Sequence, residues 1–244
     1  MLFTESGDDL TDRIRAAKAA GFDAVEFWRW SHRDLPALRA ALDESAIGLA
    51  GILCEPIAQL GDPDTHEAFL IGVGQSMRAA QQLGAPVIIA QTGNEIVGSS
   101  RVSQHAAIVR AYAQAAELLV GSGITLAIEP LNDRVDHPGY FLTSTEEGLD
   151  IVDEVNQPQV RLLYDIYHSA VMGEQTDEVL AGRVDRLVHV HLADAPGRGE
   201  PGSGSMDYRE RLEWIVGAGY DGLVGLEYRP TAGTLESLSF RDLL

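Results

Sequence analysis

The stretch Ile124-Thr-Leu-Ala-Ile-Glu-Pro130 decides the fold. Its run of apolar and β-branched residues is typical of a strand buried on both faces, as in a parallel sheet. Pro130 has no backbone N–H to donate, so the strand is expected to end there. Glu129 then lies at the carboxyl end of a buried strand. In parallel α/β proteins that edge of the sheet is where ligands bind.

The same pattern, an apolar run followed by a polar side chain, occurs three more times along the chain. The runs and their side chains are 160–164 with Asp165, 187–190 with His191, and 223–226 with Glu227. Successive members are about 30 residues apart, which suits one strand, a loop, a helix and a second loop. We therefore expect four consecutive strands to bring Glu129, Asp165, His191 and Glu227 to one rim.

Strand and helix patterns alternate through the whole chain. Expected strands are 2–3, 22–27, 47–53, 86–90, 124–128, 160–164, 187–190 and 223–226. Expected helices are 8–20, 35–45, 64–83, 102–121, 144–155, 176–181, 208–218 and 235–244, with Thr143 or Ser144 capping the fifth. Eight such units in 244 residues predict a single domain, 1–244, with the (β/α)₈ TIM-barrel fold. Leu2 and Phe3 are interpreted as the remains of a short first strand.

Composition narrows the functional class. The formal net charge is −19 and Lys18 is the one lysine, so the chain is expected to repel phosphate backbones rather than bind nucleic acid. No apolar run approaches the roughly 18 residues that a membrane span needs. We expect no signal peptide from the start of the sequence, and Cys54 has no cysteine partner within the chain. These features predict a cytoplasmic enzyme.

Two glutamates, an aspartate and a histidine are suited to a divalent cation, Mg²⁺ or Mn²⁺, with Co²⁺ also possible. A six-coordinate ion held by these four side chains would keep about two positions for a substrate with adjacent carbonyl and hydroxyl oxygens. The ion would stabilise a developing enediolate. Glu129 and Glu227 are the candidate acid and base. Returning the proton to the neighbouring carbon gives isomerisation, and returning it to the opposite face of the same carbon gives epimerisation.

Three further side chains are predicted to bind substrate. His168 follows Asp165 by three residues and could hydrogen-bond a substrate oxygen. Arg198, in the loop after 187–190, could pair with a substrate carboxylate through both guanidinium nitrogens. Arg134, in the loop after Glu129, is a second candidate for that role.

Other polar and aromatic residues have simpler interpretations. Glu55 with Pro56 resembles Glu129 with Pro130, but no partner set follows it, so it is interpreted as part of the rim. Trp28 and Trp30 either line the pocket or pack against the barrel. The remaining histidines outside the strands are interpreted as surface or loop residues: His32, His66, His105 and His137.

Taken together, these motifs resemble the hydroxypyruvate isomerase family of the xylose isomerase-like barrels. The motifs are Ile128-Glu-Pro-Leu-Asn132 with Pro138-Gly-Tyr-Phe141, Tyr164-Asp-Ile-Tyr-His168, Pro196-Gly-Arg198 with Glu200-Pro201, and Gly225-Leu-Glu-Tyr-Arg-Pro230 with Ala232-Gly-Thr234. The resemblance implies interconversion of hydroxypyruvate and tartronate semialdehyde, or of a related short keto acid. It also implies metal ligation by the four rim residues, with the two glutamates as the acid/base pair.

The sequence also leaves open functions other than that of a hydroxypyruvate isomerase. Hydroxypyruvate isomerases can carry glutamine at the position of His191, and histidine there is the pattern of ketose 3-epimerases. Those epimerases usually carry a further glutamate where this chain has Val135. Endonuclease IV-type repair enzymes share the fold but need a trinuclear zinc site and a DNA partner, which the charge disfavours. A non-catalytic binding barrel would have no need for paired bases.

Overall fold

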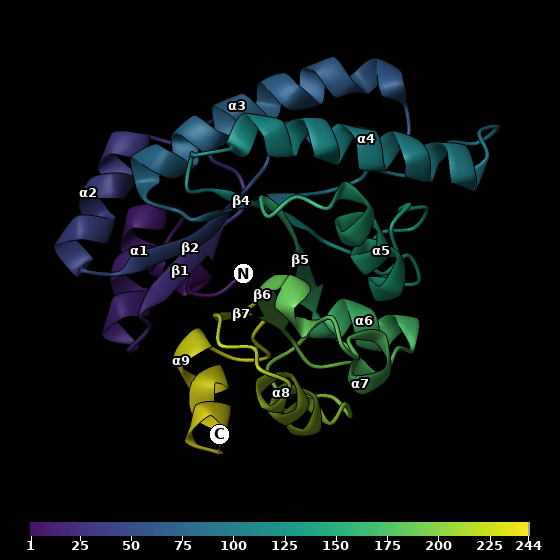
Figure 1. Cartoon of the computed structure of the whole chain (residues 1–244). Coiled ribbons are helices and arrows are strands. Elements are labelled where there is room, and N and C mark those ends of the chain that lie inside the picture. The colour runs from purple at the N-terminus through teal and green to yellow at the C-terminus, as the bar shows by residue number, and fades with distance from the viewer. Residues whose placement is uncertain (244) are drawn as a thin grey trace.

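A computed structural model of the chain describes residues 1–243. Seven strands alternate with helices along the chain. Figure 1 shows how these elements are arranged. The strands are β1 (Ala24–Phe27), β2 (Gly48–Leu53), β3 (Val87–Ala90), β4 (Thr125–Ile128), β5 (Val160–Asp165), β6 (Leu187–Leu192) and β7 (Val224–Leu226). The α-helices are α1 (Leu10–Ala19), α2 (Leu35–Ser45), α3 (His66–Leu83), α4 (Arg101–Leu119), α5 (Thr145–Val155), α6 (Ile166–Met172), α7 (Thr176–Val179), α8 (Tyr208–Gly217) and α9 (Thr234–Ser237). Short 3₁₀ helices are η1 (Thr4–Ser6), η2 (Pro63–Thr65), η3 (Val184–Arg186) and η4 (Leu238–Leu243).

The strands form one parallel sheet in the order β1 to β7, so every strand pairs with its neighbours in sequence. The sheet curls into a nearly closed barrel, with the helices around its outside (Figure 1). The TIM-barrel prediction is confirmed. Because all strands run the same way, their carboxyl ends meet at one rim of the barrel. In the register of this rim, Asp165 is opposite His191, and His191 is opposite Gly225.

The expected first strand at Leu2 and Phe3 is wrong. Phe3 has a left-handed backbone, with φ of 56°, which is incompatible with an extended strand. It is followed at once by the 3₁₀ helix η1. Within residues 1–243 the sheet therefore has seven strands, and β1 and β7 are its two edges.

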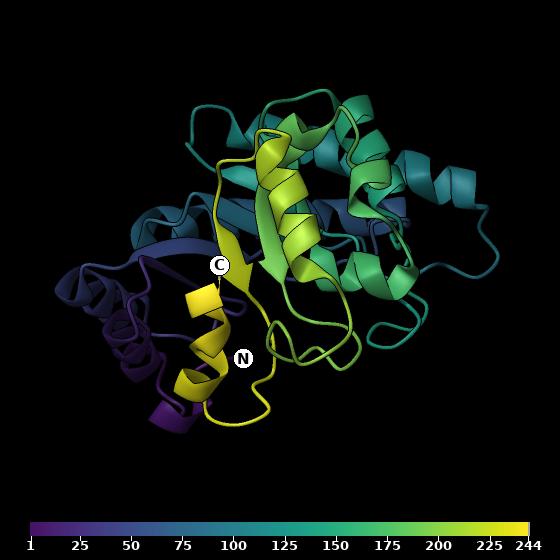
Figure 2. The ribbon, with the colours of Figure 1, turned by 90° about the horizontal axis from the view of Figure 1, so that it is seen from below.

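The two ends of the chain meet beside these edges (Figure 2). The backbone N–H of Phe3 donates to Thr234 Oγ1 at 2.8 Å, and the Glu5 carboxylate accepts from both the backbone and the hydroxyl of Thr234. Arg241, in η4, donates to the carbonyl of Ala20 after α1. Hydrogen bonds between side chains and backbone thus hold the termini together across more than two hundred residues of sequence.

The barrel contains its own small apolar cluster, separate from the larger core between the sheet and the helices. Its buried members are Leu53, Val87, Ile89, Ala127 and Leu163. Side chains two residues apart on a strand share a face. Ala127 therefore shares its face with Glu129, and Leu163 shares its face with Asp165. The apolar cluster forms the floor beneath the polar residues of the rim.

Candidate active site

The four polar side chains at the strand ends come together at the rim. Glu129 follows β4, Asp165 ends β5, His191 lies in β6 and Glu227 follows β7. Each is at most 7% exposed, and one ligand atom from each lies within 4.8 Å of the others. At this separation the negative charges of the carboxylates would repel one another unless a bound cation or ion pairs within the group balanced them. The donor set of three carboxylates and one imidazole suits a divalent ion.

His191 lies at the centre of this group. Its Nδ1 is 3.5 Å from Glu129 Oε1 and 3.4 Å from Glu227 Oε2, and this buried atom has no hydrogen-bond partner. Burial lowers the pKa of His191, but the surrounding carboxylates, Glu26 and Glu227 above all, raise it well above its usual value. A buried ring nitrogen without a partner, aimed between two carboxylates, is the arrangement that a metal ion would complete.

The two glutamates have opposite electrostatic environments. Burial raises the pKa of Glu129, and the neighbouring charge of Glu227 adds to that rise, so Glu129 holds a proton more readily than an exposed glutamate. Burial also raises the pKa of Glu227, but the positive charges of His191 and Arg198 lower it further, so Glu227 stays ionised. Two carboxylates whose pKa values are pushed apart can serve as an acid and a base.

Asp165 uses its two oxygens for different purposes. Oδ1 accepts from the backbone N–H groups of Tyr167 and His168, at 2.7 and 3.1 Å, and so caps the N-terminus of α6. Oδ2 lies 3.6 Å from His168 Nε2 and 3.9 Å from Arg198 Nη2, on the side of the site. Helix α6 was missed from the sequence, although an aspartate directly after an apolar strand is a common N-cap. The cap fixes the direction of the carboxylate and leaves one oxygen for a ligand.

His168 presents a defined ring nitrogen to the site. Its Nδ1 accepts from the backbone N–H of Asn132 at 3.0 Å and lies 2.7 Å from Asn132 Nδ2. Burial lowers the pKa of His168, so the ring is neutral, and its proton must be on Nε2 because Nδ1 is an acceptor. His168 Nε2 is buried and has no hydrogen-bond partner. It is therefore a free donor, as a side chain that binds a substrate oxygen must be.

Arg198 enters the site from the loop after β6. Its backbone is left-handed, with φ of 55°, and its guanidinium is buried. Nη2 donates to Glu227 Oε2 at 2.6 Å, and Nη1 lies 3.7 Å from Asp136 Oδ1. The guanidinium carbon lies 5.1 Å from the ring centroid of Tyr167, whose hydroxyl donates to Asp136. Asp136 and Tyr167 were not predicted, and they hold Arg198 at the edge of the candidate metal site.

The structure does not bring Arg134 into this group. Its side chain is exposed and donates to the carbonyl of Val171 at 3.1 Å. Its role in substrate binding stays a prediction. Glu55 is occupied elsewhere, because its carboxylate accepts from the backbone N–H groups of Trp30 and Ser31 and ties the loop after β1 to the end of β2.

Among the remaining histidines, the prediction of a surface or loop position was wrong for His66. His66 is buried, and its Nε2 bonds the carbonyl of Leu60. His137 lies in the loop after β4, as expected, but it is half-buried and its ring is 5.5 Å from that of His168, so it lies beside the site. His32 is exposed, as expected. No local pattern marked His66, because its partner is set by the turn before α3.

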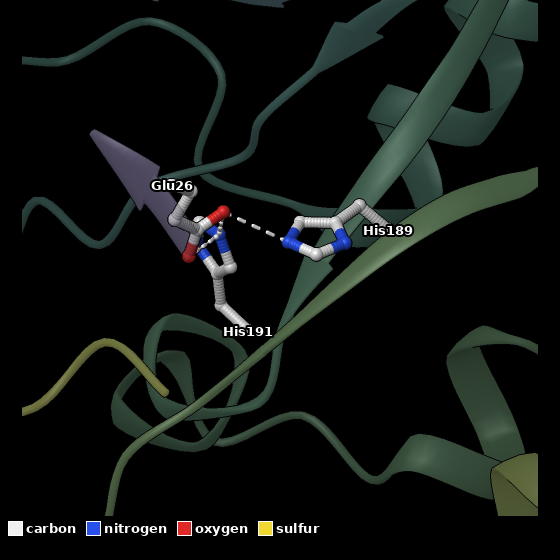
Figure 3. A group of neighbouring side chains, drawn as sticks. All are labelled: Glu26, His189 and His191. Carbon is white, nitrogen blue, oxygen red and sulfur yellow. Dashed lines mark hydrogen bonds and ion pairs between the residues drawn. The ribbon is translucent and has the colours of Figure 1, made fainter. Parts of the chain in front are cut away.

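Two residues deeper in the barrel were also missed. Glu26, in β1, accepts hydrogen bonds from Nε2 of both His189 and His191, as Figure 3 shows. Burial raises the pKa of Glu26, but the charge of His191 and these hydrogen bonds lower it more strongly, so the carboxylate is ionised. The available signal was a carboxylate inside the otherwise apolar strand Ala24–Phe27, together with a histidine two residues before His191.

Comparison with known proteins decides the family. The xylose isomerase-like TIM barrel family matches residues 14–242. The chain is 32% identical to the hydroxypyruvate isomerase of Escherichia coli, over 99% of this chain and 95% of the relative. This chain belongs to the hydroxypyruvate isomerase family. It is also 32% identical to the 2-oxo-tetronate isomerase of Cupriavidus necator, over 94% of this chain and 90% of the relative. The chain is an isomerase, and the resemblance inferred from the sequence motifs is confirmed.

A solved structure shows the same fold. A protein described as an AP endonuclease, family 2, from Brucella melitensis superposes with a TM-score of 0.91 and 27% identity, over 99% of this chain and 95% of that one. Within residues 1–243, no helix combines the length and apolar character needed to cross a membrane.

Proposed function

We propose that this isomerase interconverts a short 2-keto acid and its aldehyde isomer, in the manner of hydroxypyruvate and tartronate semialdehyde, using a divalent metal ion. The observation that carries the proposal is the convergence of Glu129, Asp165, His191 and Glu227, with the unpartnered His191 Nδ1 among the three carboxylates. The similarity to a hydroxypyruvate isomerase and a 2-oxo-tetronate isomerase supports a keto-acid substrate. The four side chains would hold Mg²⁺ or Mn²⁺, which would polarise the substrate carbonyl as a Lewis acid.

In this reaction a proton leaves one carbon and returns to its neighbour. In hydroxypyruvate, the ionised Glu227 takes a proton from C3, which leaves an enediolate. Glu129, whose pKa is raised, delivers a proton to C2. The hydroxyl proton moves from the oxygen on C3 to the oxygen on C2, so no atom enters or leaves. After one turnover Glu227 carries the proton and Glu129 is ionised, and exchange of these protons with water restores both glutamates before the next turnover.

Two more side chains orient the substrate in this proposal. The free Nε2–H of His168 donates to a substrate oxygen and stabilises the negative charge that develops there. The Arg198 guanidinium is close enough to Glu227 to pair with a carboxylate that enters beside it. A cationic partner for a substrate carboxylate favours a keto acid over a neutral ketose.

Proton NMR in D₂O tests this function directly. The Mg²⁺-loaded protein is supplied in parallel with hydroxypyruvate, 2-oxo-tetronate and fructose. We expect an aldehyde isomer to form from a keto acid, with solvent deuterium at the carbon that receives the proton. Glu227→Gln should lose about 10²–10⁴-fold of this activity because it removes the base.

The matched control is Glu55→Gln, which changes another buried glutamate at a strand end without touching the four-residue group. It should retain the activity. Inversion at C3 of fructose, with no reaction of either keto acid, would instead identify a ketose 3-epimerase. Equal activity in Glu227→Gln and the wild type would exclude the assigned base.

A further inference from the structure

Glu26 forms a bridge between the two sides of the barrel. It lies on β1, yet its carboxylate bonds two histidines of β6: His189 Nε2 to Oε2 at 3.0 Å, and His191 Nε2 at 3.1 Å from Oε1 and 3.2 Å from Oε2. Figure 3 shows both rings turned toward the carboxylate. The three side chains are at most 17% exposed. Neither Glu26 nor His189 has a part in the proposed proton transfer.

Gly225 makes this bridge possible. It lies on β7, which pairs with β6, and is opposite His191 in the register. A Cβ at Gly225 would lie 2.5 Å from Glu26 Oε1, 2.9 Å from His189 Nε2 and 3.0 Å from His191 Cδ2. Any larger residue would have to displace the carboxylate. The missing side chain thus creates the space through which Glu26 reaches β6.

The contact with Glu26 determines which ring nitrogen of His191 carries a proton and which is free to bind a ligand. Nε2 of both imidazoles lies within hydrogen-bond distance of the Glu26 carboxylate oxygens, which accept, so each ring places a proton on the Nε2 that faces Glu26. Once His191 gives up its second ring proton, as a metal-binding imidazole must, the lone pair is on Nδ1, the atom that points between Glu129 and Glu227. The His189 ring packs edge-on against His191, with centroids 4.9 Å apart and planes at 85°, and limits rotation of the ring.

We propose that Glu26 is a positioning residue that, with His189, fixes the ring orientation and tautomer of His191 so that Nδ1 can bind the metal ion. This proposal rests on the metal-dependent function proposed above. A carboxylate on the far nitrogen of a metal-binding histidine also makes the imidazole a better electron donor. Glu26 would raise metal affinity without touching either metal or substrate.

A purely structural role is the competing explanation, because Glu26 also joins one edge of the sheet to a strand near the other edge. Metal affinity separates the two roles. The metal-free full chain is titrated with Mn²⁺ by calorimetry, and unfolding temperatures are measured alongside. We expect Glu26→Gln to weaken Mn²⁺ binding about 10–100-fold, the usual effect of removing such a partner. Glu55→Gln should bind Mn²⁺ like the wild type even if it unfolds at a lower temperature.

Imidazole ¹⁵N NMR gives a readout that a structural role would not change. In the Mg²⁺-loaded wild type, His191 should carry its proton on Nε2 only, and Glu26→Gln should show a second population protonated on Nδ1. If Glu26→Gln fails to fold, Gly225→Ala displaces the same carboxylate and should weaken Mn²⁺ binding in the same direction. Wild-type affinity together with an unchanged His191 tautomer, in a folded variant, would overturn the proposal. These measurements need no turnover, so the proposal can stand even if the keto-acid activity is not found.

Discussion

The Arg198 guanidinium donates to Glu227 Oε2 at 2.6 Å, which joins the predicted carboxylate receptor directly to the predicted base. The guanidinium therefore affects both the pKa of Glu227 and the electrostatic potential at the position of a substrate carboxylate. It lowers the pKa of Glu227, after the larger effect of His191, and it supplies positive charge where a substrate carboxylate would lie. A change at Arg198 should affect acidic substrates more than neutral ones.

Arg198→Gln should raise KM for hydroxypyruvate about 10–100-fold, because a charged hydrogen bond contributes about 1.5–3 kcal/mol. Binding of fructose, measured as competitive inhibition, should change much less. Arg134→Gln tests the other predicted arginine, and its contact with the Val171 carbonyl leads us to expect a smaller effect. Steady-state kinetics on both variants is the measurement. Equal loss of affinity for hydroxypyruvate and fructose in Arg198→Gln would count against a carboxylate-binding role.

The tautomer of His168 gives a second prediction. Asn132 donates to Nδ1 and so keeps the proton on the Nε2 that faces the site. His168→Phe removes this donor and should lower kcat about 10²–10³-fold, as loss of a hydrogen bond to a developing oxyanion does. Asn132→Ala keeps the ring but removes the side-chain contact to Nδ1, and should have a smaller effect in the same direction. An unchanged kcat in His168→Phe would show that Nε2 does not contact the reacting oxygen.

The rim residues were predictable because one rule places them. Parallel strands present their carboxyl ends at the same edge, so a polar residue after each apolar run had to converge with the others. Glu26 was not predictable in this way. Its contacts with His189 and His191 span 163 and 165 residues, and the space they need comes from a glycine on a third strand. The missing strand at Phe3 had a different cause, because a left-handed backbone conformation overrode an apolar sequence.

One oxygen of Asp165 caps α6 and the other faces the site. A substitution that keeps the capping oxygen should therefore weaken metal binding with little effect on the stability of the metal-free fold. Asp165→Asn can keep an oxygen at the Oδ1 position that caps α6, but replaces the charged oxygen that faces the site. The metal-free variant should unfold near the wild-type temperature. Mn²⁺ at about one hundred times its Kd should stabilise the wild type by about 2.7 kcal/mol and the variant by far less. Thermal unfolding with and without Mn²⁺ is the check. A large loss of stability in the metal-free variant would show that the cap depends on the charge.

Away from the site, His105 on α4 lies between two glutamates of α5. Its Nδ1 is 3.2 Å from Glu147 and its Nε2 is 3.0 Å from Glu154. Burial lowers the pKa of His105, but the hydrogen bonds to the glutamates raise it more, so the folded-state pKa is above the usual value of 6.5. A raised pKa means that the folded state binds the proton more tightly than the unfolded chain does. The resulting stabilisation is fully present below about pH 6.5, while the glutamates are ionised, and is lost as the pH rises through the folded-state pKa.

His105→Gln should therefore lower the free energy of unfolding more at about pH 6 than at about pH 9. Urea unfolding of the wild type and the variant at both pH values measures this difference, and groups that titrate equally in the two proteins cancel. His32→Gln, at an exposed position, is the matched control and should show no such dependence. The same loss of stability at both pH values would mean that His105 contributes through packing against α5 and not through its charge.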